Sequence, residues 1–350
     1  MRTLVTTCVL ATIVGSGVPP RSARCETWPA DERETHLRNI TQLTFGGQNA
    51  EAYFSADGEQ LVFQSTRDSF PCDQIFTMPS TGGTPTLIST GKGRTTCSFW
   101  APDGQSIIYA STHLGGSECP PEPDFSQGYV WAVYGSYELF LVRPDGSNLT
   151  RLTSSPGYDA EAVYSHDGKT ILFTSSRDND LELYTMRPDG TDVRRLTHHV
   201  GYDGGAFFSP GDSLICWRAD HRDDSAGQAD FQALLAQDLI RPSRLELFVM
   251  RADGSNQKQV TNLGGANFCP FFTPDASGII FSSNHHAKDG REFDLFLVNL
   301  ADGKVEQITF TPEFDGFPMF SPDGKRLVWC SNRHGKVRGE TNVFVADWVK

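Results

Sequence analysis

Length and charge already limit what this chain can be. It has 350 residues, with 30 lysine and arginine side chains against 43 aspartate and glutamate side chains, which gives a formal net charge of −13. That balance argues against a nucleic-acid binder, which needs a basic surface, and against electrostatic docking on an anionic membrane. The 38% of hydrophobic residues allows a sizeable core, and 33 glycines with 20 prolines indicate many turns.

The first residues have the order of an export signal. Met1 and Arg2 form a short positive start, residues 4–14 are mainly apolar, and the small residues 15–17 follow. An apolar run of about eleven residues is too short for a transmembrane helix, which needs roughly 20. We therefore expect residues 1–25 to be a signal peptide, cleaved between Gly17 and Cys25. The mature protein is expected to be periplasmic or secreted, with no transmembrane segment.

From residue 37 onward, one repeat occurs six times. Its most regular feature is a turn of the Asp-Gly type, which recurs at Asp57, Asp103, Asp167, Asp212, Asp275 and Asp323. The spacings between these aspartates are 46, 64, 45, 63 and 48 residues, so the second and fourth units carry insertions. Asp-Gly between β-rich runs predicts a hairpin, because the tight turn needs positive φ.

Each unit contains four short runs typical of β-strands. Four strands in about 45 residues, repeated along a chain, are the pattern of a propeller blade. Residues 37–44 match a fourth strand without its own blade, and the last unit stops at its third strand, residues 342–348. We therefore predict an all-β fold, a six-bladed β-propeller with four-stranded blades. The N-terminal strand is expected to complete the last blade and close the ring, which hides the strand edges.

The units resemble the PD40 (WD40-like) repeats of the TolB β-propeller family. The residues that carry the resemblance are Phe320-Ser-Pro-Asp-Gly-Lys325, Leu183-Tyr-Thr-Met-Arg-Pro-Asp-Gly190 and Arg195-Leu-Thr197. The resemblance covers residues 37–349 and implies a TolB-like propeller with a periplasmic protein-interaction role. The chain contains no Gly-x-Ser-x-Gly sequence, which argues against a serine hydrolase.

Aligning the units on their turns places polar residues at the start of the first strands. This ring consists of Asn49, Thr95, Asp159, Asp203, Asn267 and Asp315. First strands line the channel of a propeller, so an oxygen-rich ring at its mouth is suited to Ca²⁺, with Asp159, Asp203 and Asp315 as candidate metal ligands. The alternative is that these side chains cap strand ends and bond loop amides. Two residues further on, the ring reads Glu51, Cys97, Glu161, Gly205, Cys269 and Phe317.

A second ring lies just after the second strands and contains only arginine and histidine. Its members are Arg67, His113, Arg177, His221, His285 and Arg333. We expect this collar on the face of the first ring, where it would bind a carboxylated or phosphorylated ligand. The alternative is structural: each member pairs with a carboxylate of its own or the neighbouring blade. The three histidines are also suited to a transition metal over the axis.

Both insertions are expected on the same face as the rings. Residues 114–136 include an aromatic stretch at 129–134. Residues 222–243 contain an amphipathic run at 230–240, with Leu234, Leu235 and Leu239 as its apolar stripe, which predicts one short helix. Aromatic loops on a rigid scaffold favour binding. The alternative is that the insertions cover blade edges.

The cysteines divide by their place in the repeat. Cys72 and Cys119 lie in second-to-third-strand loops of adjacent blades, so Cys72–Cys119 is the predicted disulfide, with Cys72–Cys97 as the rival. Cys97 and Cys269 occupy equivalent positions in opposite blades, beyond the Cα limit of about 7 Å for a disulfide.

These observations support two functions. The first is a non-enzymatic exported binding or scaffold protein that presents its loop-rich face to a protein or an envelope polymer. The second is a metal-dependent polysaccharide lyase or hydrolase that acts over the central funnel. It rests on a resemblance to oligogalacturonate lyases, which also use a TolB-like propeller. That resemblance implies a divalent metal at His113, His221 and His285, and an arginine such as Arg67 or Arg333 beside a uronate carboxylate.

Overall fold

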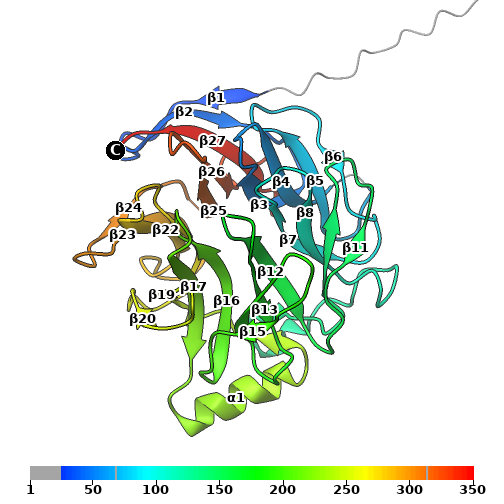
Figure 1. Ribbon diagram of the computed structural model, residues 1–350. Coiled ribbons are helices and arrows are strands. Elements are labelled where there is room, and N and C mark those ends of the chain that lie inside the picture. Colours follow the sequence, from blue (N-terminus) through cyan, green and yellow to red (C-terminus); the bar gives the residue numbers. More distant parts are fainter. Residues whose placement is uncertain (1–24, 68, 313) are drawn as a thin grey trace, which may run out of the picture.

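Six antiparallel sheets, each a blade of four strands, surround a central axis (Figure 1). The computed structural model describes residues 25–67, 69–312 and 314–350. The predicted signal peptide lies outside these residues except for Cys25. Within the described residues, strands pair along each blade in the order expected from the repeat. The prediction of an all-β, six-bladed propeller is confirmed.

The first strands of the blades lie around the axis and contact one another. They are β3 (Gln48–Phe54), β7 (Thr95–Trp100), β12 (Asp159–Tyr164), β16 (Gly201–Phe208), β21 (Asn267–Phe272) and β25 (Asp315–Phe320). The second strands are β4 (Gln60–Thr66), β8 (Ile107–Ser111), β13 (Ile171–Ser175), β17 (Leu214–His221), β22 (Gly278–Ser283) and β26 (Arg326–Ser331). The third strands are β5 (Gln74–Pro79), β10 (Glu138–Val142), β14 (Glu182–Met186), β19 (Glu246–Arg251), β23 (Asp294–Asn299) and β27 (Asn342–Trp348). The outer strands are β6 (Thr86–Leu87), β11 (Thr150–Arg151), β15 (Arg194–Arg195), β20 (Lys258–Gln259), β24 (Val305–Gln307) and β2 (Leu37–Gln42).

The last blade is completed by the N-terminal strand, as predicted. β2 pairs antiparallel with β27, and the short β1 (Glu26–Trp28) adds a fifth strand outside it. Figure 1 shows these blue strands beside the red β27. Leu37 and Ile40 of β2 are fully buried. Closure therefore covers the edge of β27 and joins the two ends of the propeller.

A serine or threonine at the end of each repeat, preceded by leucine, isoleucine or valine, fastens the end of the repeat to the third strand. In every blade a hydroxyl accepts the backbone N–H of the second residue of the third strand, at 2.8–3.0 Å. These hydroxyls belong to Thr44, Ser89, Thr153, Thr197, Thr261 and Thr309. Thr44 makes this bond to Val343, from the other end of the chain, and it also donates to Asn342 at 3.1 Å. The same local bond thus serves in ring closure.

Every first strand contains a β-bulge at the same place. The register with the second strand shifts around one residue that has a left-handed backbone, with φ between 50° and 58°. These residues are Glu51, Cys97, Glu161, Gly205, Cys269 and Phe317. A bulge turns a side chain out of the alternating pattern of a strand. The ring read from the sequence two residues after the strand starts is therefore the ring of bulges.

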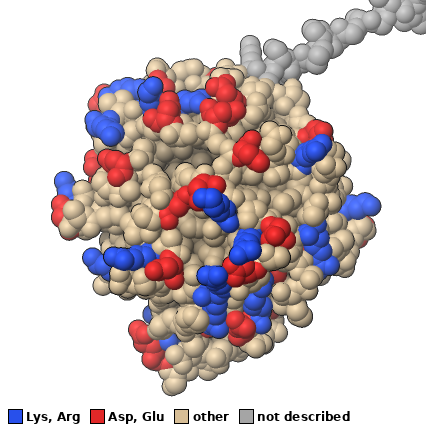
Figure 2. Space-filling view, viewed as in Figure 1, with Lys and Arg blue, Asp and Glu red and all other residues tan. Residues whose placement is uncertain are grey.

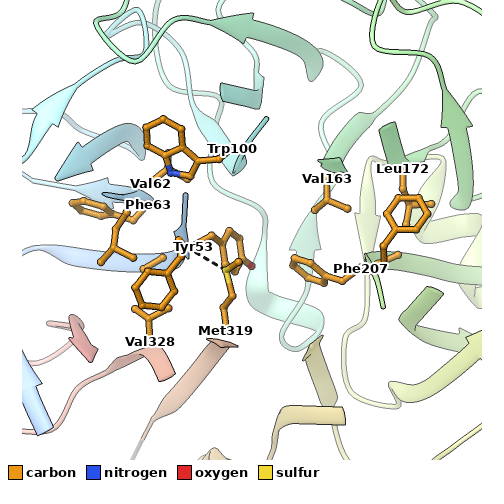
Figure 3. Close-up of a cluster of buried hydrophobic side chains, with 14 of the residues drawn as sticks. Tyr53, Val62, Phe63, Trp100, Val163, Leu172, Phe207, Met319 and Val328 are labelled. Carbon is orange, nitrogen blue, oxygen red and sulfur yellow. Dashed lines mark hydrogen bonds between the residues drawn. The ribbon is translucent and has the colours of Figure 1, made fainter. Parts of the chain in front are cut away.

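Beyond the bulges, the axis is filled by side chains from the first strands. The Tyr53 ring lies 5.5 Å from that of Phe207, which in turn lies 6.0 Å from Phe99 and 5.2 Å from Phe271. Figure 3 shows Tyr53 and Met319 meeting between the blades, with Phe207 facing them. These side chains pack into the channel below the bulges.

The insertion of blade 4 forms helix α1 (Ser225–Leu235), which begins and ends earlier than the predicted 230–240. Asp224 sets its start, because its Oδ1 accepts the Gly227 N–H at 2.8 Å. Leu239 belongs instead to strand β18 (Leu239–Ile240), because pairing with the other insertion holds this segment extended. Among the described residues, no helix is long and apolar enough to cross a membrane.

Candidate functional site

The two insertions are joined to each other and to the propeller. Strand β9 (Trp131–Ala132) of the blade-2 insertion pairs with β18 of the blade-4 insertion. A 3₁₀ turn, η1 (Phe125–Gln127), precedes β9. The structure contains a Cys72–Cys119 disulfide with a Cα–Cα distance of 6.1 Å, and Cys97, the rival partner, is a free thiol. The insertions therefore form one braced wall rather than two separate loops.

A cavity of about 1360 Å³ lies between this wall and the mouth of the channel. We call it the funnel pocket. The bulge residues Glu51, Cys97, Glu161 and Cys269 form its floor, and the β22–β23 loop, residues 284–291, contributes to its rim.

Glu161 is the most heavily bonded side chain of the floor. Its carboxylate forms an ion pair with Arg218 of β17, and the two side chains are 8% and 11% exposed. The Tyr202 hydroxyl donates to Oε1 at 2.9 Å. The Thr174 hydroxyl and the Gly205 N–H donate to Oε2 at 2.7 and 2.9 Å. Glu161 thus ties blade 3 to blade 4 beneath the pocket.

Glycine at position 205 makes room for Arg218. A Cβ built on Gly205 would lie 1.9 Å from Arg218 Nη1, and its φ of +58° also favours glycine. The guanidinium that fills this space stacks on Trp131 and Tyr202, at 5.4 and 5.5 Å from the ring centroids. Arg218 therefore connects the floor to the insertion wall.

Glu51 is the other carboxyl group of the floor. Its Oε1 accepts a hydrogen bond from Cys97 Sγ at 3.4 Å, and it forms no salt bridge within the part of the chain that the structure describes. Burial raises the pKa of Glu51 to about 7, against the lowering effects of the Cys97 hydrogen bond and the Arg218 charge. The floor therefore carries a carboxyl group that is partly protonated near neutral pH, a property that recurs at functional sites.

Aromatic side chains line two sides of the pocket. One side is formed by tyrosines, with centroid distances of 6.1 Å from Tyr134 to Tyr137 and 5.7 Å from Tyr137 to Tyr158. The other side is formed by phenylalanines spaced 5.1–6.0 Å apart, namely Phe268, Phe293, Phe314 and Phe317. Trp131 joins the two sides, 6.2 Å from Phe268. These rings offer both apolar contact and π faces to a ligand.

The rim is polar and carries both signs of charge. Arg94 pairs with Glu122 at 2.5 Å and with Asp73 at 3.5 Å. Lys288 and Arg291 are exposed on the β22–β23 loop and form no salt bridge within the described residues. Figure 2 shows acidic and basic side chains interspersed over one face of the molecule, in keeping with the many pairs. The charge of −13 therefore does not make every site on the protein acidic.

Each member of the Arg/His collar is held within its own blade. Arg177, His221 and Arg333 bond to the aspartates that start their blades, Asp159 at 2.9 Å, Asp203 at 3.0 Å and Asp315 at 3.1 Å. Arg67, His113 and His285 each bond to a serine hydroxyl at or next to the end of their second strand. These serines are Ser65, Ser111 and Ser283. Burial lowers the pKa of His113 and His285, which leaves them neutral at pH 7. The carboxylate pairs of the structural alternative are therefore formed by three of the six members. Of the six residues, His285 lines the funnel pocket.

The three aspartates expected as metal ligands are likewise engaged in their blades. Asp159, Asp203 and Asp315 are at most 1% exposed, and none of them lines the funnel pocket. Asp203 and Asp315 also accept from the indoles of Trp217 and Trp329. Among the described residues, ligand atoms close enough to hold a metal ion occur elsewhere, at His286, Glu292 and Asp294.

Arg218 stands outside both rings of the repeat pattern, so its role was not predicted. The residue lies in the middle of β17, where the other blades have Gln64, Ala110, Thr174, Ser282 and Cys330. A lone charged residue at an otherwise uncharged position, together with the lone glycine in the ring of bulges, was the available signal. Recognising it requires knowing that the two positions face each other.

Known proteins share the propeller fold. Residues 240–338 match the model of the PD40 family, the TolB beta propeller domain. The fold is that of a TolB-like β-propeller. An uncharacterized protein of Agrobacterium fabrum is 31% identical to the TolB-like chain over 145 residues. A TolB homolog of Chlorobium luteolum is 26% identical over 145 residues. Each match covers 35% of this chain, and the chain spans 49% and 33% of the two relatives.

Solved structures extend the similarity to most of the TolB-like propeller. TolB from Acinetobacter baumannii superposes with a TM-score of 0.57 and 18% identity, covering 87% of this chain and 64% of that one. Oligogalacturonate lyase from Vibrio parahaemolyticus superposes with a TM-score of 0.54 and 14% identity, covering 93% and 96%. At these identities the likeness shows the fold alone.

Glu51 should make the stability of the protein fall as the pH rises. Its pKa is about 7 in the folded state against an ordinary value of 4.5, so between these pH values the folded state retains a proton that the unfolded state has lost. As the pH rises from about 4.5 to about 8, the free energy of unfolding of Glu51→Gln in urea should increase by about 1–3 kcal/mol relative to that of the wild type. Glu59→Gln, an exposed residue with the same charge change, is the control. Identical pH slopes for Glu51→Gln and the wild type would contradict this expectation.

Proposed function

We propose that this TolB-like propeller is an exported binding protein that takes a segment of a partner protein or envelope polymer into the funnel pocket. The observation that carries the proposal is the pocket itself. At about 1360 Å³ it exceeds the roughly 300–1,000 Å³ of sites for single small molecules, which favours a segment of a longer chain. Its lining of aromatic rings with a few charged groups is typical of a recognition surface.

The construction of the pocket supports binding by a rigid site. The disulfide and the β9–β18 pairing hold the wall, and the Glu161–Arg218 ion pair holds the floor. A preformed site loses little conformational entropy when a ligand enters it. His285, from the Arg/His collar, is included in the proposed site because it lines the pocket.

Export is part of the proposal and has two supports. Residues 1–25 have the order of a secretory signal. The Cys72–Cys119 disulfide is the kind of bond that persists in an oxidising compartment and is rare in the cytosol. We therefore place the binding function in the periplasm or outside the cell.

A second function, polysaccharide cleavage over the funnel, is favoured by one observation. A carboxyl group with a pKa near 7 is suited to general acid–base catalysis, and Glu51 is such a group at the floor of the pocket. The same property serves equally in binding a charged ligand. Cleavage of a bound polymer, rather than its retention, would favour this second function.

Filling the mouth of the pocket should abolish partner capture. Ser243 is exposed and lines the pocket, so Ser243→Trp places an indole in the opening. We expect the immobilised variant to capture at least about tenfold less of the partner from a solubilised envelope fraction than the wild type. Gln105→Trp adds the same side chain at an exposed turn between β7 and β8 and should capture as the wild type does. Equal capture by both variants would place the binding surface elsewhere.

A further inference from the structure

We propose that the floor of the funnel pocket binds a primary ammonium group, with the Glu51 carboxylate as its counter-ion and aromatic rings around it. This inference rests on the proposed function and names the chemistry of the group that enters deepest. Two sources carry that group in a peptide segment, the side chain of lysine and the free N-terminus. Both present the same charge and the same three N–H donors.

The first observation is that, among the described residues, Glu51 is the acid of the pocket that forms no salt bridge. Glu161 is paired with Arg218, and both Asp73 and Glu122 are paired with Arg94. Glu51 has the Cys97 thiol as its hydrogen-bond partner, at 3.4 Å, and a thiol is a weak donor. An incoming cation therefore finds its unmatched negative charge at this residue.

The second observation is that the backbone holds Glu51 in place. It is the bulge residue of β3, with φ +53°, and it lines both the funnel pocket and the narrow space beneath it. Its partner Cys97 is fixed in turn, because Gln64 Oε1 accepts the Cys97 N–H at 3.0 Å. The carboxyl group is thus preorganised to receive a ligand rather than carried on a loop.

The third observation is the aromatic surround. Tyr137, Tyr158 and Tyr202 line the pocket together with Phe268 and Phe317. Burial raises the pKa of Tyr158 and Tyr202 well above the usual range of tyrosine, so these rings remain neutral and keep their π faces. Aromatic faces attract an ammonium through the ring quadrupole, and this attraction grows when water is excluded.

The arrangement disfavours an anion at the same depth. The charge of Arg218 is matched by Glu161, and its guanidinium is stacked on Trp131 and Tyr202. Lys288 and Arg291, which form no salt bridge with any residue that the structure describes, lie on the exposed rim loop instead. A ligand that matches both the floor and the rim carries its positive group at the inner end and any negative groups further out.

The test uses three pentapeptides of glycine and phenylalanine that differ only in their amines. One has a free N-terminus and no lysine, one is N-acetylated and contains a lysine, and one is N-acetylated without lysine. Binding is measured by isothermal titration to the full-length protein. We expect at least one ammonium-bearing peptide to bind roughly tenfold tighter than the neutral peptide, and the stronger of the two identifies the source.

Glu51→Gln is the decisive variant because it keeps the shape and removes the charge. It should bind all three peptides with the affinity of the neutral one. Glu59→Gln, with the same charge change at an exposed turn, should retain the wild-type preference. Unchanged binding of the neutral peptide by Glu51→Gln shows that the pocket is intact.

Three results would overturn the inference. They are equal binding of all three peptides by the wild type, a preference that survives in Glu51→Gln, and no binding of either ammonium-bearing peptide at millimolar concentration. Failure of the proposed function looks different, because Ser243→Trp would then leave partner capture unchanged. If Ser243→Trp blocks capture while the ammonium preference is absent, the pocket binds its partner through another group.

Discussion

Replacing Arg218 with methionine should lower the free energy of unfolding by about 3–5 kcal/mol, because the change leaves a buried carboxylate without its partner. Glu161 is 8% exposed and would keep its position between blades 3 and 4, held by Tyr202 and Thr174. The stacking of the guanidinium on Trp131 would be lost as well, so the insertion wall loses its contact with the floor. Methionine approximates the length of the aliphatic part of arginine, which keeps the loss of packing small.

Urea unfolding of a double-mutant cycle measures this effect. Glu161→Gln in the Arg218→Met background should recover part of the loss, since the uncompensated charge is then removed. Arg194→Met is the matched control, because Arg194 is 70% exposed and pairs with Asp192 at the surface. We expect that control to cost less than about 0.5 kcal/mol. If Arg218→Met costs no more than Arg194→Met, the ion pair does not anchor the floor.

Truncating Ile40 to alanine should destabilise the whole propeller by about 2–5 kcal/mol, although the residue lies near the N-terminus. Ile40 belongs to β2, is fully buried, and is part of a hydrophobic cluster that contains Trp329 and Phe344 of the last blade. β2 pairs with β27, so a weakened β2 exposes an edge strand and opens the ring. The free energy of unfolding in urea, followed by circular dichroism, is the measurement.

The neighbouring residue Arg38 supplies the control for this prediction. It lies in the same strand with an exposed side chain, and Arg38→Ala should change stability by less than about 0.5 kcal/mol. A single cooperative transition at lower urea is expected for Ile40→Ala. A separate early transition that involves only the last blade would mean that closure is local and does not stabilise the ring as a whole.

Much of the fold was open to prediction because its chemistry is local and repeated. An Asp-Gly turn needs only its own backbone to form, and Asp57 and Asp323 both accept the N–H two residues further on. The serine or threonine at the end of each repeat likewise bonds to the third strand of a single blade. Six copies of such signals establish the period, and the period establishes the blade. The helix was misplaced because the pairing of β18 with β9 links segments far apart in the chain.

The candidate site was harder to predict because the same residue type serves several purposes. Arg177 follows the second strand of blade 3, and Arg218 lies in the second strand of blade 4. Arg177 pairs with an aspartate of its own blade, whereas Arg218 pairs with a glutamate of the preceding blade. Their partners, Asp159 and Glu161, are two residues apart in one strand. The bulge decides between them, because it turns Glu161 toward the axis while Asp159 stays in the blade.

The sequence by itself determined the architecture of this protein: the number of blades, the turns, and the strand that closes the ring. Only the tertiary structure decided where the funnel pocket lies and which residues line it. The funnel pocket is lined by residues such as Arg218, whose position in the other blades is uncharged, and Trp131, which belongs to the blade-2 insertion. Their roles depend on which side chain fills the space beside Gly205 and on which carboxyl group lacks a salt bridge. These contacts join residues of different blades, so they form only when the ring closes.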